Sequence, residues 1–323
     1  MDKSTKYFGI DISKDVFDVM DMENNHYQFL NNSTGFKSFY KLLDKNSHCV
    51  MEATAYYYSK LAYFLIGKSI RVSVENPVAI KRFIQMKLSK IKTDKSDAKM
   101  ICLYAQNVEL KLWKGNSNNQ NECLQIISLL NVFIKQSTAL KNKIHGEQTL
   151  GLPSKIVISS LKRSLKQNKK EQETLESKLI ELVKKDHQQL LTLIESIPGF
   201  GRKTSTLLIV ITDGFSRFET ASSLCSFSGI TPIIRKSGTS VNGKPRISKM
   251  GNQKLRNHLF LCSFNACKYN KACMAIYERI TNKGKSKKLA LMAVANKLLK
   301  QAFAIAKSGI PYDENYCSKL IVK

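Results

Sequence analysis

The chain is short of acidic residues, and the shortage is uneven. Its 323 residues include 52 Lys and Arg but only 25 Asp and Glu, which gives a formal net charge of +27. Between Glu219 and Asp313 the only acid is Glu278. Such a surface predicts a polyanionic partner, because each basic side chain that displaces counterions from a phosphate backbone gains affinity. Nucleic acid is the default partner, with an anionic membrane surface or a merely solvated face as alternatives.

Other features are also missing. The eight cysteines form no Cys-x-x-Cys pair and the five histidines are scattered, so neither a zinc site, a His-based metal site nor a disulfide framework is indicated. Apolar runs such as Leu207–Ile211 are too short to span a bilayer, and the first residues lack the apolar core of a signal peptide. We therefore expect a cytosolic protein that binds no membrane.

Four acids stand out against the basic background. Asp11 lies in an apolar, strand-like run, Glu52 ends another, and Asp94 and Asp97 lie three positions apart at the start of a helical pattern. Residues three apart on a helix emerge on one face. In so basic a chain these acids predict a site for a divalent metal, since carboxylate oxygens are the ligands that such cations prefer. A purely structural explanation of the pair is that Asp94 caps the helix and Asp97 favours its dipole.

The first hundred residues alternate strand and helix patterns. Three strands are expected at 7–12, 16–22 and 26–30, joined by short polar turns suited to antiparallel hairpins, and a helix follows at 35–43. A strand at 48–53, a helix at 57–66 and a strand at 70–74 complete the pattern. This order is that of a ribonuclease H-like α/β sheet, in which the first and fourth strands are neighbours. Asp11 and Glu52 would then meet in space.

The remaining sequence predicts a mainly helical protein in two further parts. Long helical patterns run from 121 to about 190 with a break at Gly151–Pro153, and they form either a spacer or a dimerisation element. We thus expect three domains: an α/β domain at 1–118, a helical hairpin or short coiled coil at 119–190, and a mostly α-helical DNA-binding domain at 191–323.

Two motifs in the last domain suit phosphate chemistry. Gly199 and Gly201 allow a tight turn before a helix, which leaves backbone amides and Lys203 available to hold a phosphate, as in helix-hairpin-helix modules. Further along, hydroxyls lie among basic residues, as expected of a nucleophile beside the phosphate it attacks. Simple phosphate contact by these hydroxyls is the alternative explanation. The basic residues expected to contact nucleic acid are Lys203, Arg235, Lys236, Arg246, Lys249 and Arg256.

These motifs together resemble the DEDD transposases of the insertion sequence 110 family, to which the Piv/MooV DNA invertases are related. The resemblance spans nearly the whole chain and rests on segments that occur in the family's order: Gly9–Asp11, Glu52–Thr54, Thr93–Ala98, Ile197–Gly201, Gly229–Pro232, Ser237–Gly238, Arg246–Asn252 and Leu255–Arg256.

The resemblance implies a mechanism and partners. Asp11, Glu52, Asp94 and Asp97 would be the catalytic, metal-binding acids of a RuvC-like domain, with Mg²⁺ bound or Mn²⁺ as an alternative. A serine in the C-terminal domain would become covalently linked to DNA. We assign it to Ser237, with Ser240 and Ser248 as competitors. The partners implied are donor and target DNA, a structured noncoding guide RNA and further copies of the chain, as a dimer or tetramer, on the nucleoid of a prokaryotic cytoplasm.

Two other functions compete with a serine recombinase. A RuvC-like nuclease would use the same acids to activate water, and the serines would only bind phosphate. A catalytically silent nucleic-acid-binding protein would need no chemistry at the acids. Actin-like sugar kinases share the first strand and its aspartate, but a Gly-rich turn follows it there, whereas Asp11 is followed by Ile-Ser-Lys-Asp. The kinase interpretation therefore fails.

Overall fold

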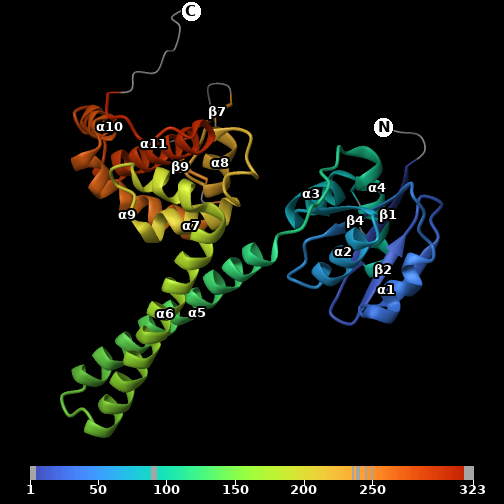
Figure 1. Ribbon diagram of the computed structural model, residues 1–323, viewed down its shortest axis with the longest axis horizontal. Helices are drawn as coiled ribbons and strands as arrows, with labels where there is room; N and C mark the ends of the chain where they lie inside the picture. The colour runs from blue at the N-terminus through green and yellow to red at the C-terminus, as the bar shows by residue number, and fades with distance from the viewer. Residues whose placement is uncertain are drawn as a thin grey trace, which may run out of the picture. The chain divides into compact units, whose positions relative to one another are not determined.

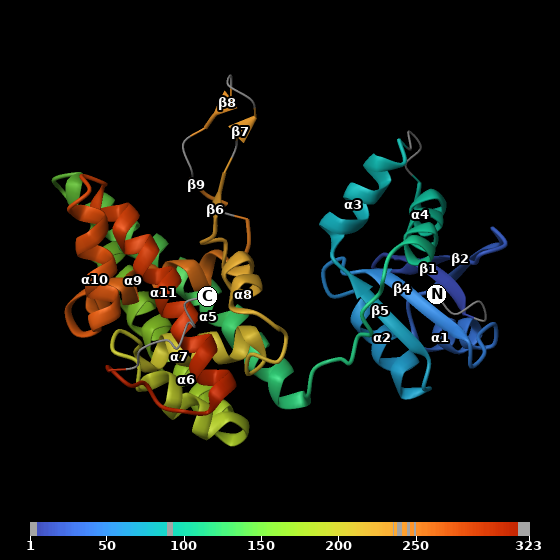
Figure 2. The ribbon, with the colours of Figure 1, turned by 90° about the horizontal axis from the view of Figure 1, so that it is seen from above.

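The chain divides into two units, Met1–Asn116 and Ser117–Lys323, and each is described here by itself. The structure, a computed structural model, describes residues 5–88, 93–234, 236–237, 241–243, 246–248 and 250–315. Figures 1 and 2 show a first unit built on a sheet and a second built almost wholly of helices. The expected mixture of an α/β part and a helical part is confirmed.

The first unit is a five-stranded sheet with helices on both faces. Its strands lie in the order β3-β2-β1-β4-β5; β1 is antiparallel to β2 and parallel to β4. The predicted order of three strands, helix, strand, helix, strand is confirmed. The elements are β1 Lys6–Ile12, β2 Val16–Met20, β3 His26–Leu30, α1 Ser33–Tyr40, β4 Ser47–Glu52, α2 Tyr58–Gly67, β5 Arg71–Glu75, α3 Pro77–Met86 and α4 Asp94–Asn107.

Most element ends differ from the prediction by one to three residues, and two of the differences have a clear local reason. Strand β2 ends at Met20 rather than at residue 22, because the Asp21 carboxylate accepts hydrogen bonds from the amides of Glu23 and Asn25 and starts a turn. Helix α1 begins two residues early, since the Asn32 side chain caps it by accepting from the Thr34 and Gly35 amides.

The two faces of the sheet pack against different helices. On one face, Ile10 and Phe17 pack with Phe39 of α1 and Leu61 of α2 in one fully buried cluster. The opposite face supports α3 and α4 through a second cluster, in which Val50 of β4 takes part. Since side chains alternate along a strand, the residues two places on from Gly9 and Val50, which are Asp11 and Glu52, face the α4 side.

The second unit begins with a long antiparallel helical hairpin, α5 and α6, which lie side by side (Figure 1). One hydrophobic core joins the base of this hairpin to the later helices. The elements are α5 Asn118–Thr149, α6 Lys155–Glu195, α7 Arg202–Thr212, α8 Ala221–Ser228, β6 Pro232–Ile233, β7 Lys236–Ser237, β8 Val241–Asn242, β9 Arg246–Ile247, α9 Gln253–Tyr269, α10 Lys271–Thr281 and α11 Lys287–Ser308.

Helix α6 passes through residue 190, where we expected a domain boundary. Its backbone is interrupted only at His187, with φ −136° and ψ 32°, and it then continues to Glu195. The finer division of this unit into a hairpin and a C-terminal domain remains a proposal.

Two helices are longer and more apolar than the sequence analysis expected. By length and hydropathy alone, α5 and α11 could each cross a membrane. Helix α11 instead supplies core residues such as Val294 and Leu298, and α5 supplies Ile127 and Leu130. Packing in the core thus accounts for part of the apolar character of both helices. The seven cysteines among the described residues are all free thiols, as expected.

Candidate active site

Two of the four acids lie at one edge of the sheet. Asp11 is the next-to-last residue of β1 and Glu52 is the last residue of β4. The two strands are parallel neighbours, with Ile10 opposite Met51, so their carboxyl ends meet at the same edge. The sequence prediction that Asp11 and Glu52 lie on adjacent strands is confirmed.

Helix α4 brings the other two acids to this edge because Gly9 lets it approach. A Cβ atom placed on Gly9 would lie 2.2 Å from the Cys102 backbone nitrogen and 2.4 Å from the Ala98 backbone oxygen. Backbone atoms cannot yield at such distances as a flexible side chain can. Gly9 therefore seats the α4 backbone directly on β1, two residues before Asp11.

The start of α4 is capped by residues other than the two aspartates. Thr93 is the N-cap: its side chain accepts from the Ser96 amide, and the Ser96 hydroxyl accepts from the Thr93 amide. The structural explanation that Asp94 is the cap is thus wrong. Asp94 is exposed and Asp97 half-buried, both in the first turn, where the helix dipole favours negative charge.

The four acids influence one another electrostatically. The pKa of Asp11 is raised to about 6, first by burial and then by the charges of Asp97, Asp94 and Glu52, with Asp18 contributing last. Four carboxylates from β1, β4 and α4 therefore share one neighbourhood inside the first unit. Such mutual repulsion, in a chain with few acids, marks a candidate functional site.

Asp18 was missed in the sequence analysis. It lies directly opposite Asp11 in the β1–β2 pair and is 4% exposed. One carboxylate oxygen lies 2.7 Å from His26 Nε2, and the Gln28 amide donates to the same carboxylate at 3.3 Å. The expected strands at 7–12 and 16–22 leave the pairing register open, so the sequence marks Asp18 only as an acid in the strand next to that of Asp11.

Glu75 is a second acid that was not predicted. It ends β5 opposite Glu52, the last residue of β4, and burial raises its pKa. The hydroxyl of Tyr104, which lies on α4, donates to the Glu75 carboxylate at 3.3 Å. The sequence signal was an acid at the end of a buried strand, the same signal that identified Glu52.

The donor set suits a divalent metal ion. Carboxylate oxygens are what Mg²⁺ and Mn²⁺ prefer, and the repulsion that raises the Asp11 pKa is the charge that a divalent cation neutralises. Within the described part of the chain, no three His, Cys, Asp or Glu side chains are grouped closely enough to hold one ion as they stand. Binding by these acids would therefore require their side chains to turn toward a common point.

In the second unit, a β-hairpin carries the predicted nucleophile. Strand β6 pairs with β9, and β7 pairs with β8, with Ser237 opposite Val241. The base of this hairpin is held by close backbone packing: a Cβ on Gly251 would lie 2.2 Å from the Phe227 oxygen, and one on Gly229 would lie 2.4 Å from the Met250 oxygen.

Arg256 completes this base. Its Nη1 donates to the Ser228 carbonyl at 3.0 Å, and the Asn252 amide donates to the Phe227 carbonyl at 2.8 Å. Arg256, expected to contact nucleic acid, is therefore engaged at least in part in holding the chain on either side of the hairpin.

The three candidate serines differ in what the structure describes. Ser237 lies in β7. Ser248 follows β9, and its hydroxyl donates to the Met250 carbonyl at 3.1 Å. Ser240 lies outside the described residues, as do Arg235 and Lys249 among the predicted basic contacts. Lys236 is described only as part of β7, and Arg246 is exposed in β9.

The glycine turn before α7 has the expected shape but not the expected free lysine. Gly199 has φ +112°, and a Cβ there would lie 2.8 Å from the Ala266 Cβ, so both backbone conformation and packing require glycine. Gly201 is the N-cap of α7 and offers no side-chain cap. The Lys203 Nζ pairs with the Glu176 carboxylate at 2.6 Å, so a phosphate would have to take the place of that carboxylate.

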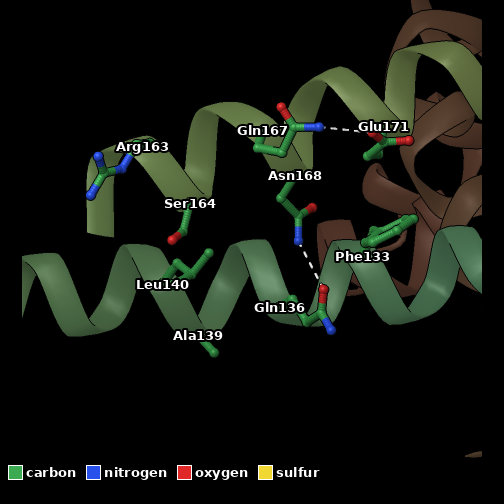
Figure 3. Close-up of a pocket in the computed structure, with 9 residues that line it drawn as sticks. All are labelled: Phe133, Gln136, Ala139, Leu140, Arg163, Ser164, Gln167, Asn168 and Glu171. Atoms are coloured by element: carbon green, nitrogen blue, oxygen red, sulfur yellow. Dashed lines mark hydrogen bonds between the residues drawn. The ribbon is translucent and has the colours of Figure 1, made fainter. Parts of the chain in front are cut away.

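A cavity of about 570 Å³ lies between α5 and α6 and is lined by none of these residues (Figure 3). Asn168 crosses it: its Nδ2 donates to Gln136 at 2.9 Å, and its Oδ1 accepts from the Ser137 hydroxyl at 3.0 Å. Gln172 donates to the same oxygen at 2.7 Å. A buried polar layer of this kind fixes the register of two helices, and we regard the cavity as a structural feature of the hairpin.

Comparison with known proteins defines first the class, which is that of DNA transposases and recombinases. Residues 8–149 match a DEDD transposase family model of the IS110 group, and residues 191–278 match the model described as the transposase IS116/IS110/IS902 family. A pilin gene-inverting protein of Moraxella lacunata is 30% identical over 96% of this chain and 98% of its own length, and one of Moraxella bovis is equally similar.

An uncharacterized insertion element IS110 protein of Streptomyces coelicolor is 30% identical over 52% of this chain and 42% of its own length. The chain belongs to the IS110 family of transposases, as the sequence motifs indicated. It is an enzyme whose substrate is DNA.

Proposed function

We propose that this chain is a site-specific recombinase that cuts and rejoins DNA through a covalent serine intermediate. The observation that carries the proposal is the gathering of Asp11, Glu52, Asp94 and Asp97 around one edge of the sheet, seen in the raised pKa of Asp11. The strand order of the first unit supports a RuvC-like fold for it. The inversion named for the Moraxella relatives is a reaction of this kind.

The acids would hold Mg²⁺, or Mn²⁺, against the scissile phosphate. When bound, the ion would supply positive charge to the phosphate oxygens and so stabilise the charge that develops during transfer. The residues themselves contribute position: Glu52 and Asp11 from adjacent strand ends, and Asp94 and Asp97 from the first turn of the helix that Gly9 seats.

Ser237 would be the nucleophile. Its Oγ gives up its proton and forms a bond to phosphorus, the bond from phosphorus to one deoxyribose oxygen breaks, and that oxygen takes up a proton and leaves as a hydroxyl. Rejoining reverses the step with a hydroxyl of another strand, so the phosphodiester energy is retained. Ser237 is favoured over Ser248, since the Ser248 hydroxyl already donates within its own chain.

The partners follow from the charge and from the reaction. Joining two duplexes requires more than one copy of the chain, so a dimer or tetramer is part of the proposal. A guide RNA would find basic residues beside the acids, where Lys81, Arg82, Lys87, Lys95 and Lys99 are exposed on α3, α4 and the turn after α3.

The test is a recombination assay on a plasmid carrying two recognition sites, with trapping of protein–DNA adducts. We expect Ser237→Ala to abolish both recombination and adducts, while Ser248→Ala keeps both, because Ser248 serves a local turn. Recombination by Ser237→Ala, or an adduct mapped to another residue, contradicts the assignment.

A hydrolytic nuclease is the second candidate, and one observation favours it. The acids form a site within the first unit alone, whereas the nucleophile of the recombinase lies in the second unit. Nuclease action would leave 3′-hydroxyl and 5′-phosphate ends with no protein attached, so the same assay separates the two functions. A protein that only binds nucleic acid would be unaffected in its function by Asp11→Asn.

A further inference from the structure

A cluster of ionisable side chains lies in the second unit, on helices α6, α7 and α9. It is formed by Lys203 of α7, Lys254 and His258 of α9, and Glu176 of α6, where these three helices meet (Figure 1). The four side chains line a cavity of about 60 Å³, and α5 contributes only apolar residues to it, among them Ile127 and Leu130.

Positive charge exceeds negative charge in this cluster. Lys203 Nζ lies 2.6 Å from the Glu176 carboxylate. Lys254 forms no hydrogen bond or ion pair with any residue that the structure describes. Burial lowers the pKa of Lys254, and the charge of Glu176 offsets part of that effect. The Glu176 carboxylate thus compensates part of the charge of two ammonium groups. One of them, that of Lys254, is half-buried and has no hydrogen-bond or ion-pair partner among the described residues.

His258 adds a third donor. Its Nδ1 lies 3.3 Å from the Thr204 hydroxyl oxygen, which accepts a weak hydrogen bond from the Cys262 thiol at 3.4 Å. The Thr204 hydroxyl can therefore donate its own proton to His258 Nδ1. The neutral imidazole then carries its ring proton on Nε2. Burial lowers the pKa of His258, and Lys254 and Lys203 lower it further, against the opposing effect of Glu176. These effects favour the neutral imidazole, which can gain a proton when an anion binds beside it.

Thr206 supplies an independent sign of an unfilled polar site. It lines the same cavity, its residue is 1% exposed, and its buried Oγ1 has no hydrogen-bond partner among the described residues. An unpaired buried hydroxyl costs free energy, so its retention calls for an explanation such as a ligand.

We propose that Lys203, Lys254 and His258 form a binding site for a phosphate group, in which the Glu176 carboxylate stands in while no ligand is bound. A tetrahedral phosphate presents several acceptor oxygens to donors from different directions, which a single carboxylate cannot match. Lys203 and the uncapped N-terminus of α7 lie at the same place, and both favour an anion. Where the phosphate belongs to a nucleic-acid backbone, the inference rests on the proposed function and adds an anchoring contact to it.

The test is the affinity of the full chain for a short DNA duplex, measured by fluorescence anisotropy over a range of salt concentrations. Glu176→Gln removes the stand-in and should tighten binding about fivefold. Lys254→Met should weaken it about tenfold and reduce the salt slope by about 1, as expected for one lost phosphate contact. A gain in affinity for Glu176→Gln cannot result from misfolding.

The matched control substitutions lie on helix α6, which also carries Glu176. Lys178 and Glu181 form an exposed pair, with Lys178 Nζ 3.0 Å from the Glu181 carboxylate. Lys178→Met and Glu181→Gln change the net charge of the chain by the same amounts as the test variants. If each test variant behaves like its control, both with DNA and in the phosphate measurement below, the proposal is overturned.

A pH measurement adds a second readout. A bound phosphate raises the His258 pKa, so proton uptake should accompany binding, and DNA affinity should rise as the pH falls from 8 to about 6. The phosphodiester does not titrate in this range, and the other charged groups facing His258 are Lys203, Lys254 and Glu176. His258→Gln should flatten this dependence beyond any change seen in Lys178→Met.

Inorganic phosphate separates the two sources of the ligand. Melting of the protein in phosphate and in chloride at equal ionic strength should show stabilisation by phosphate that Lys254→Met loses. If only this effect appears, the ligand is free phosphate, and if the DNA effects also appear, it is the backbone. Ser237→Ala tests the recombinase separately, because loss of the nucleophile leaves this site intact.

Discussion

The two units place their chemical groups in different ways. In the first, the acids lie at the ends of paired strands and in a capped helix turn, and the α4 backbone rests directly on β1 at Gly9. In the second, the candidate nucleophile lies in a two-residue strand of a hairpin whose base is fixed by Gly229, Gly251 and Arg256. The candidate acid site is therefore held in place by core packing, whereas the candidate serine is positioned by contacts at the base of its hairpin.

The largest expected effect comes from Asp11→Asn, which breaks the acid site while leaving the hairpin intact. We expect a loss of strand transfer of roughly 10³-fold or more, because several kcal/mol of charge stabilisation are removed. DNA binding, carried by the basic side chains, should persist. Recombination at a normal rate by Asp11→Asn contradicts a catalytic role for the acid site.

The same variant should stabilise the fold. With divalent cations removed, Asp11 titrates at about 6 in the folded chain against 3.8 in the unfolded chain, so the folded state binds more protons between these values. Stability therefore falls as the pH rises from 3.8 to about 6, and Asp11→Asn should escape this loss. Added Mg²⁺ should raise the melting temperature of the wild type more than that of the variant. Equal shifts argue against a metal site at Asp11.

The second prediction concerns the seat of α4. Gly9→Ala places a methyl group against backbone atoms of Cys102 and Ala98, so α4 must move away from β1. We expect a loss of about 3 kcal/mol in unfolding free energy and a fall in activity, because Asp94 and Asp97 move with the helix. Gly67→Ala is the control, since Gly67 lies in α2 with nothing within 4 Å of the added Cβ. Its stability should stay level or rise by up to about 1 kcal/mol.

The sequence alone predicted the four acids, but not the residues that pack around them. Asp11, Glu52, Asp94 and Asp97 were found because strand ends and helix starts have local signatures. The partnership of Gly9 with Cys102, and of Asp18 with Asp11, depends on register and on the approach of distant backbones, which local periodicity does not report. The same holds for Lys203, whose pairing with Glu176 of α6 follows only from tertiary packing.

The third prediction tests the base of the hairpin that carries Ser237. Gly229 and Gly284 have nearly equal positive φ values, +71° and +69°, but only Gly229 has backbone in the way, with the Met250 oxygen 2.4 Å from an added Cβ. Gly284→Ala should cost about 1 kcal/mol from its backbone conformation alone. Gly229→Ala should cost about 2–3 kcal/mol and should lower recombination while leaving the Asp11 pKa unchanged. Equal effects of the two substitutions on recombination would mean that the hairpin base is not held by this contact.

The smallest effect distinguishes two histidines, the buried His48 of the first unit and the half-buried His258 of the second. His48 of β4 donates from Nε2 to the Ser73 hydroxyl at 2.8 Å, and Ser73 in turn donates to the Lys111 carbonyl at 2.9 Å. Burial, and then Arg71, lowers the His48 pKa to about 4, from 6.5 in the unfolded chain. The unfolded state therefore binds more protons between these values, and stability should fall by about 1–2 kcal/mol as the pH drops from 7 to 5.

His48→Gln keeps an N–H donor but cannot titrate. The fall in unfolding free energy between pH 7 and pH 5, measured with denaturant, should therefore be smaller in this variant by the amount that His48 contributes. His258 differs, because its proton is coupled to a ligand as well as to folding. Its pKa is also lowered by burial, so His258→Gln should change the pH dependence of unfolding in the same direction as His48→Gln. Only His258→Gln should also change the pH dependence of DNA affinity. If His48→Gln instead altered DNA affinity, the first unit would contribute to binding through its core, and the contrast between the two histidines would fail.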